Sequence, residues 1–213
     1  RYVSRAVEDI AHQNGFSVIL CNNDEDPEKE KMYLQLMQDQ NIAGIILSPT
    51  RKAAQEFESI SSLNIPLAVI DRRVTNFEVD NIFIDNVFSA EKTTTHLCDN
   101  GYKRIAGLFG DGSTTGRERH QGYMNALKKA GYKAPKELIK FIAPREEAGY
   151  HATLKLLQLV NPPDAIFTSN SLLAAGVLLA LQEKKLSVPD QIALTTFDDT
   201  SWTKLGTPAI TVV

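Results

Sequence analysis

The sequence predicts an α/β protein of two Rossmann-like lobes, each a parallel sheet flanked by helices, with a cleft between the lobes. Short apolar runs alternate with amphipathic runs along the 213 residues, and this alternation is typical of βαβ units. A second observation is a weak internal repeat of helix–Gly–strand steps at residues 14–16, 100–102 and 130–132. The repeat places residues 1–83 in the first lobe and 84–207 in the second. Residues 208–213 are expected to be a strand that crosses back toward the first lobe.

The first lobe is expected to begin with a helix over residues 1–14, because its apolar residues fall on one face. Asp26 and Pro27 suit the N-cap and the first position of a second helix, and a cap is the favoured role for Asp26. Apolar runs that end in polar residues predict the strands. The strands are expected at 16–21, 42–47, 67–70 and 82–84, and the helices at 1–14, 27–40 and 52–63.

The second lobe continues the alternation with longer strands. Gly101 and Gly131 follow two helical runs directly, where a helix C-terminus favours glycine. The strand at 192–197 is apolar on both faces, as in a buried parallel strand. The strands are expected at 104–109, 138–143, 165–168, 192–197 and 210–213, and the helices at 90–100, 117–130, 146–159 and 172–184.

The two ends of the sequence are abrupt. The first helix starts at Arg1 without a cap or a preceding strand, and the last strand ends the chain at Val213. We therefore expect a piece of a longer protein that is truncated at both ends and lacks the first strand of its first lobe.

Composition restricts the function. A net charge of −3 and a pI near 5.8 give no basic footprint for nucleic acid. No run approaches the roughly 18 apolar residues of a membrane span. Cys21 and Cys98 lie far apart without metal-ligand spacing, so a reduced, cytoplasmic chain with no metal and no cofactor is expected.

Polar residues follow the predicted strands, at the edge where open α/β sheets bind ligands. Their hydroxyls, amides, carboxylates and guanidinium groups suit a molecule with neighbouring hydroxyls, such as a sugar. A hydrogen bond to a charged group contributes about 1.5–3 kcal/mol, so a few of them select such a ligand. These residues are Asn22, Asn23, Ser48, Asp71, Arg72, Asp85, Asn86, 110–115, Ser169, Asn170, Asp198 and Asp199.

Each residue has a structural alternative. Asp71 suits loop solvation as well as ligand binding, and Asn170 or Ser171 suits a helix cap. One of Asp198 and Asp199 is expected to face the cleft and the other to cap the next turn. Arg119 alone would be a surface charge, but the loop at 113–116 places it in the first turns of a helix, which attract electronegative groups.

An enzyme is disfavoured. The sequence has no GxSxG elbow and no P-loop, and residues 110–112 are only a fragment of a dinucleotide fingerprint. Adjacent carboxylates at Asp198 and Asp199 point in different directions, which argues against an acid–base pair on one substrate atom. The histidines, expected on helix surfaces, are His12, His96, His120 and His151.

Taken in order, these segments resemble the LacI/GalR family of bacterial transcription regulators over the whole chain. The matching segments are NNDEDPEKE (22–30), AGIILSP (43–49), PLAVIDR (66–72), IDN (84–86), GRERHQGY (116–123), VPDQIA (188–193), FDD (197–199) and TPAITVV (207–213). The resemblance implies a periplasmic-binding-protein-like effector core, allosteric control by a sugar-like molecule, and operator DNA bound through a helix-turn-helix domain that is not in this chain.

The resemblance also implies residue roles. Effector-binding positions would be Ser48, Asp71, Ser113, Thr115, Arg119, Asn170 and Asp198. A homodimer is implied, with Trp202 and Leu205 on its interface, although an intrachain core position suits Trp202 equally. Ser171 and Pro144 stand where many members have an aspartate and a ligand-stacking aromatic residue. The alternative function is a periplasmic sugar-binding protein of a transporter, which would be monomeric and exported.

Overall fold

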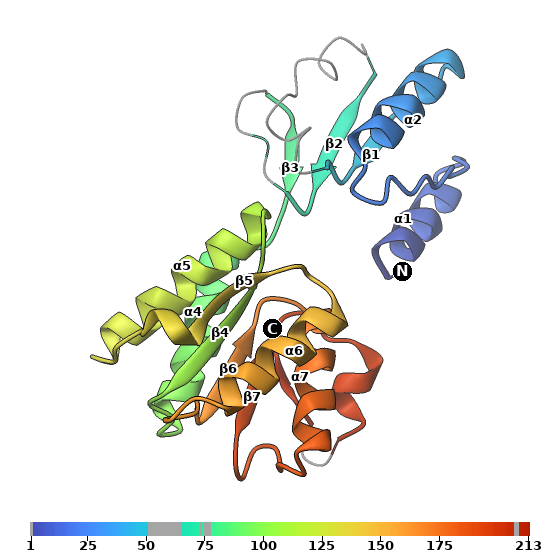
Figure 1. Cartoon of the computed structure of the whole chain (residues 1–213). Coiled ribbons are helices and arrows are strands. Elements are labelled where there is room, and N and C mark those ends of the chain that lie inside the picture. The colour runs from blue at the N-terminus through green and yellow to red at the C-terminus, as the bar shows by residue number, and fades with distance from the viewer. Residues whose placement is uncertain (1, 51–64, 73, 75–77, 207–208) are drawn as a thin grey trace. The chain divides into compact units, whose positions relative to one another are not determined.

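The structure is a computed structural model that describes residues 2–50, 65–72, 74, 78–206 and 209–213. The chain divides into two compact units, Arg1–Phe83 and Ile84–Val213. Within these described ranges, each unit contains a sheet whose paired strands are all parallel, with three strands in the first and five in the second. Helices flank both sheets (Figure 1), so the predicted α/β class is confirmed.

Among the described residues of the first unit, α2 packs on a small sheet of order β1-β2-β3. Leu34 of α2 lies in a core cluster with Ile45, Leu47, Val69 and Val74. Asp26 is the N-cap of α2 and accepts a hydrogen bond from the Glu28 amide at 2.9 Å, which confirms its predicted capping role. The elements are α1 (Tyr2–Gln13), α2 (Pro27–Asp39), β1 (Ile45–Leu47), β2 (Leu67–Ile70) and β3 (Asp80–Ile82).

Two expectations for the first unit change. The strand expected at 16–21 is wrong, because this segment pairs with no strand of the described chain and leaves Phe16 and Leu20 57% and 75% exposed. The strand expected at 82–84 lies two residues earlier, as β3, where it pairs with β2. The helix expected at 52–63 falls outside the described residues.

The second unit is a five-stranded sheet of order β5-β4-β6-β7-β8. The helices α4 and α5 cover one face and α6 and α7 the other (Figure 1). The elements are α4 (Asn86–Asp99), β4 (Ile105–Gly110), α5 (Thr114–Lys129), the 3-10 helix η1 (Lys136–Leu138), β5 (Ile139–Ile142), α6 (Glu146–Leu157), β6 (Ala165–Thr168), α7 (Ser171–Glu183), β7 (Ala193–Thr196), the 3-10 helix η2 (Ser201–Lys204) and β8 (Thr211–Val212).

Side chains of the central strands alternate between the two layers. Along β4, Leu108 packs with α6 and α7, and Phe109 packs with α4 and α5. Helices α4 and α5 approach closely at Gly122, where an added Cβ would lie 2.1 Å from the Val87 carbonyl oxygen. The period of two in the strands therefore builds both cores, and a glycine allows the helices on one face to meet.

Two helices start earlier than their hydrophobic periodicity predicts. Helix α4 begins after the N-cap Asp85, whose side chain accepts from the Phe88 amide at 2.9 Å, and α5 begins after the N-cap Ser113. The caps extend both helices into polar sequence that periodicity does not register. The C-terminal strand β8 pairs with β7 in the second unit's sheet.

Candidate functional site

The strand order of the second unit identifies one position, at the carboxyl ends of its strands, where a ligand is expected to bind. The chain leaves β4 through α5 on one face of the sheet and leaves the neighbouring strand β6 through α7 on the other face. The carboxyl ends of two such strands form the switch point at which open α/β sheets bind ligands. Here the Gly110 amide donates to Ser169 Oγ at 2.9 Å and joins the two strand ends. The candidate site therefore lies around Gly110 and Ser169, at the ends of β4 and β6.

The start of α5 is fixed on this edge by Ser113. Its Oγ accepts from the Gly116 amide at 2.8 Å and donates to the Gly110 carbonyl at 3.3 Å, while the half-buried Thr115 donates to it at 3.3 Å. Ser113 is buried. A Cβ on Gly116 would lie 2.3 Å from the Gly110 carbonyl oxygen. Two predicted site residues, Ser113 and Thr115, are thus held at the switch point by the cap of α5.

Arg119, one turn further along α5, is the buried charge of the site, with 7% of its surface exposed. Its Nε donates to Asn86 Oδ1 at 2.8 Å, and its Nη1 donates to the carbonyl oxygen of Ser169. The guanidinium carbon lies 3.9 Å from the centroid of the Phe197 ring. The interpretation of Arg119 as a solvated surface charge is therefore wrong, since a buried arginine must be satisfied by such partners.

Asn170 is the N-cap of α7. Its Oδ1 accepts from the Leu173 amide at 2.9 Å, so the capping alternative is confirmed. Its Nδ2 lies 3.8 Å from the place that a Cβ on Gly110 would take, and the Cβ of Pro144 lies 3.5 Å from the same place. Asn170 and Pro144 thus adjoin the switch point.

The two adjacent aspartates after β7 differ. Asp199 forms an ion pair with Lys204 at 2.8 Å and accepts from Thr203 Oγ1 at 3.1 Å, and the Lys204 hydrogen bond lowers the pKa of the Asp199 carboxyl. Asp198 has an exposed side chain and a positive φ of 73°, a conformation uncommon for a residue other than glycine. Asp199 therefore stabilises the turn before η2, and Asp198 is the one that presents a carboxylate.

The first unit holds the other two predicted site residues, Ser48 and Asp71. They follow the neighbouring parallel strands β1 and β2, and both are exposed. Asp71 has a φ of 69°, and its amide donates to the Ile82 carbonyl at 3.0 Å. The same left-handed backbone thus occurs at Asp71 and Asp198, each directly or almost directly after a strand.

A partly buried polar network stabilises this strand edge. Arg72 forms an ion pair with Glu25 and donates to the Pro49 carbonyl at 2.7 Å. The buried Glu30 carboxylate accepts from the Thr50 amide at 2.7 Å and from Asn23 Nδ2 at 2.8 Å. Burial raises the pKa of Glu30, although the Thr50 and Asn23 hydrogen bonds oppose that shift. The turn after β1 is therefore fixed to α2.

The predicted site residues fall into two groups, one in each unit. Ser113, Thr115, Arg119 and Asn170 lie around the switch point of the second sheet, and Asp198 follows Phe197, which contacts Arg119. Ser48 and Asp71 belong to the first unit. Asn86 and Ser169 appear among the polar strand-end residues of the sequence but not among the predicted ligand contacts. Phe197 was missed because a buried aromatic residue at a strand end has no polar signature.

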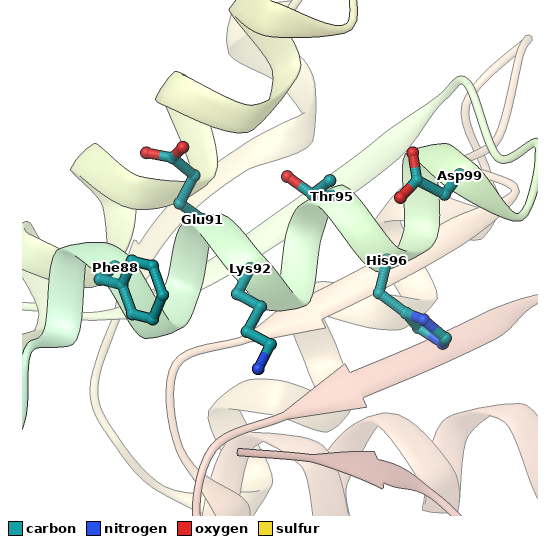
Figure 2. Close-up of a pocket in the computed structure, with 6 residues that line it drawn as sticks. All are labelled: Phe88, Glu91, Lys92, Thr95, His96 and Asp99. Carbon is teal, nitrogen blue, oxygen red and sulfur yellow. The ribbon is translucent and has the colours of Figure 1, made fainter.

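A furrow on the outer face of α4 is a different feature. Figure 2 shows Glu91, Thr95 and Asp99 in one row along the helix and Phe88, Lys92 and His96 in a second row. Among the described residues, those that line the furrow all lie on α4. No predicted site residue lines it.

The predicted interface residues differ in burial. Trp202 is half-buried and packs against the core cluster of the α6–α7 face, whereas Leu205 is 82% exposed. Within the described part of the chain, no cluster of His, Cys, Asp and Glu could hold a metal ion. None of the helices described is long and apolar enough to cross a membrane.

The fold and the polar strand ends define a protein of the type I periplasmic-binding-protein class. Residues 3–212 match the family described as "Periplasmic binding proteins and sugar binding domain of LacI family". The chain belongs to this family.

Three relatives illustrate the match. The transcriptional regulator DegA of Bacillus subtilis (strain 168) is 31% identical over 215 residues, which cover 99% of this chain and 64% of DegA. The ribose operon repressor of Halalkalibacterium halodurans is 30% identical, over 99% of this chain and 62% of the repressor. The crystal structure of the transcription regulator CcpA of Lactococcus lactis superposes with a TM-score of 0.88 at 25% identity, over 99% of this chain and 77% of CcpA.

The chain thus spans under two thirds of the length of these two curated relatives. Both are named as regulators of transcription and neither is named as an enzyme. Family membership agrees with the resemblance in the sequence and leaves the ligand to be inferred from the site.

Proposed function

We propose that this chain is the effector-binding and dimerisation core of a cytoplasmic, bacterial LacI/GalR-type transcriptional regulator. A small, polar, sugar-like molecule binds to the strand-end residues of both lobes and shifts the population of lobe arrangements. That shift controls operator binding by a helix-turn-helix domain outside this chain. A ligand shifts such an equilibrium only by its difference in affinity for the two states.

The observation that supports this most strongly is the buried guanidinium of Arg119 at the switch point. A planar fork of N–H donors held on an aromatic ring suits the oxygen atoms of a polyol. Asp198 presents an exposed carboxylate after the same sheet, and a carboxylate accepts from hydroxyls. A donor and an acceptor together can bind two neighbouring hydroxyls of one ligand.

The test is a thermal-shift screen of the 213-residue chain against sugars, sugar phosphates, polyols and nucleobases, with D-ribose as the first probe because one relative is a ribose operon repressor. Mass spectrometry of the purified protein identifies any retained ligand. We expect at least one compound to raise the melting temperature of the wild type and to lose that effect in Arg119→Ala. Arg117→Ala is the matched control, since Arg117 is exposed on the same helix.

An unchanged ligand effect in Arg119→Ala contradicts the site. Loss of the effect in Arg117→Ala to the same extent also contradicts it, because the loss would then follow from net charge. A protein that is monomeric and carries an export leader upstream of Arg1 would favour the transport-protein alternative, which the family description includes.

Dimerisation is the second part of the proposal. Leu205 is 82% exposed, and Leu172 and Leu179 on α7 are 54% and 46% exposed. An exposed apolar surface marks an interface where it is contiguous, and Leu205 is a position that the family resemblance assigns to the dimer interface. Sedimentation velocity of wild type and Leu205→Asp tests it: we expect a dimer that the charged variant dissociates. A monomeric wild type, or a dimer that Leu205→Asp leaves intact, contradicts the interface.

A further inference from the structure

Asn86 lies between two charged side chains of α5. Its Oδ1 accepts from Arg119 Nε at 2.8 Å, and its Nδ2 donates to Glu118 Oε2 at 2.8 Å. Asn86 is the first residue of α4 and is only 3% exposed. One short side chain therefore connects the carboxylate and the guanidinium of two successive residues on the neighbouring helix.

The chemistry of the three groups fixes the direction of both hydrogen bonds. A guanidinium only donates and a carboxylate only accepts, so the group between them must do both. An amide does this and can be oriented in only one way here, with its oxygen toward Arg119 and its nitrogen toward Glu118. An aspartate at this position would keep an acceptor for Arg119 but would place a second carboxylate against Glu118.

We propose that Asn86 is the positioning residue of Arg119 and that Glu118 acts through it. This inference rests on the proposed function, in which Arg119 contacts the effector. Phe197 supports the plane of the guanidinium, and the Ser169 carbonyl holds one of its terminal nitrogens. Asn86 accepts from the Nε of Arg119 and so fixes how the guanidinium is rotated over the Phe197 ring.

Asn86 lies near the start of the second compact unit, which begins at Ile84. The amide that orients Arg119 is thus in the first turn of α4, within the same unit as Arg119, Ser169 and Phe197.

The test begins without any ligand. The Arg119 Nε–H resonance of the ¹⁵N-labelled chain is assigned by its loss in Arg119→Lys, and its hydrogen exchange is measured. We expect Asn86→Ala to accelerate this exchange about tenfold or more, as the loss of a hydrogen bond to a charged group implies. We expect Asn86→Asp to accelerate it as well, because repulsion between the new carboxylate and Glu118 moves that carboxylate away from Arg119. In Asn86→Asp the exchange should become slower than in Asn86→Ala at the same pH once the pH is low enough for one of the two facing carboxylates to be protonated.

The double variant N86D/E118Q provides the rescue. The glutamine amide then donates to the new carboxylate, which accepts from Arg119. Both hydrogen bonds are thereby restored, with the negative charge moved from position 118 to position 86. We expect slow exchange to return at neutral pH. The control is Asn125→Asp, because Asn125 Nδ2 also bridges α5 to α4, to Glu91 Oε2 at 3.3 Å, without contact to Arg119. It should leave the Arg119 resonance unchanged.

Exchange that stays slow in Asn86→Ala, or a double variant that exchanges as fast as Asn86→Asp, overturns the proposal. So does an equal effect of Asn125→Asp, which would show that α4–α5 packing alone positions Arg119. Thermal shifts with D-ribose are measured separately on the same variants. If D-ribose fails to shift the wild type while exchange follows the expected pattern, the ligand assignment is at fault and the positioning role stands.

Discussion

The guanidinium carbon of Arg119 lies 3.9 Å above the ring centroid of Phe197, and both side chains are buried. A cation at this distance from an aromatic face is attracted by the ring quadrupole, the more so where water is excluded. The ring also contacts Phe167 edge-on, with centroids 6.0 Å apart. Arg119 therefore packs on Phe197, which in turn packs on Phe167 in the core of the second unit.

Phe197→Ala removes this support. We expect a loss of about 3–5 kcal/mol in the free energy of unfolding, typical of truncating a buried phenylalanine, and a loss of the ligand-induced thermal shift. Urea denaturation measures the first effect. Phe88→Ala is the control, since Phe88 is 63% exposed on the outer face of α4 (Figure 2), and it should change stability by about 0.5 kcal/mol or less. Similar losses in both variants would contradict a special role for Phe197.

Gly116→Ala tests how α5 meets the strand edge. The added Cβ would lie 2.3 Å from the Gly110 carbonyl oxygen and 2.7 Å from Ser113 Oγ, so the first turn must move away from β4. We expect a loss of about 1–3 kcal/mol, the usual range for overpacking, measured by urea denaturation. Gln121→Ala, at an exposed position of the same helix, should be nearly neutral. A Gly116→Ala protein as stable as the wild type would refute the close contact.

Glu30 predicts a pH dependence in the first unit. Burial raises the pKa of this carboxyl, so the folded state takes up its proton at a higher pH than the unfolded state does. The contribution of Glu30 to stability therefore falls as pH rises through the folded pKa and recovers as pH falls toward the ordinary value of 4.5. Urea denaturation across this range should show that the wild type gains stability relative to Glu30→Gln as the pH falls. A wild type that loses stability relative to Glu30→Gln on acidification would reverse the assigned sign.

Strands of both units follow from the sequence where their signals are local. The runs at 165–168 and 67–70 are apolar, bounded by polar residues, and become β6 and β2 with the same limits. The segment at 16–21 is also largely apolar but pairs with no strand within the described chain. A strand needs a neighbour for its hydrogen bonds, and residue pattern alone does not supply that information.

The candidate site was predictable to the extent that strand ends carry polar residues. Ser113 and Arg119 could be singled out by their place after a strand and by the family resemblance. The links from Arg119 to Asn86 and to Phe197 join residues 33 and 78 positions apart, and only the packing of α4, α5 and β7 brings them together. The sequence indicated the buried arginine as a candidate but not the groups that hold it.

His120 predicts the opposite pH dependence in the second unit. Its ring lies 5.0 Å from that of Phe109 and 5.1 Å from that of Phe141, half-buried rather than on the helix surface. Burial lowers the pKa of His120 below its ordinary value of 6.5, so the unfolded state binds the proton more readily. The free energy of unfolding should therefore fall as pH decreases below about 6.5.

His120→Phe should remove this loss, because a phenyl ring suits the aromatic cluster and carries no titratable group. Urea denaturation of both proteins between about pH 5 and pH 8 measures the difference, across the range where histidine ordinarily changes charge. His96→Gln, at an exposed position of α4, is the control and should leave the pH profile of the wild type in place. If His120→Phe loses stability on acidification as steeply as the wild type, protonation of His120 is not the cause, and the ring tolerates its charged form within the cluster.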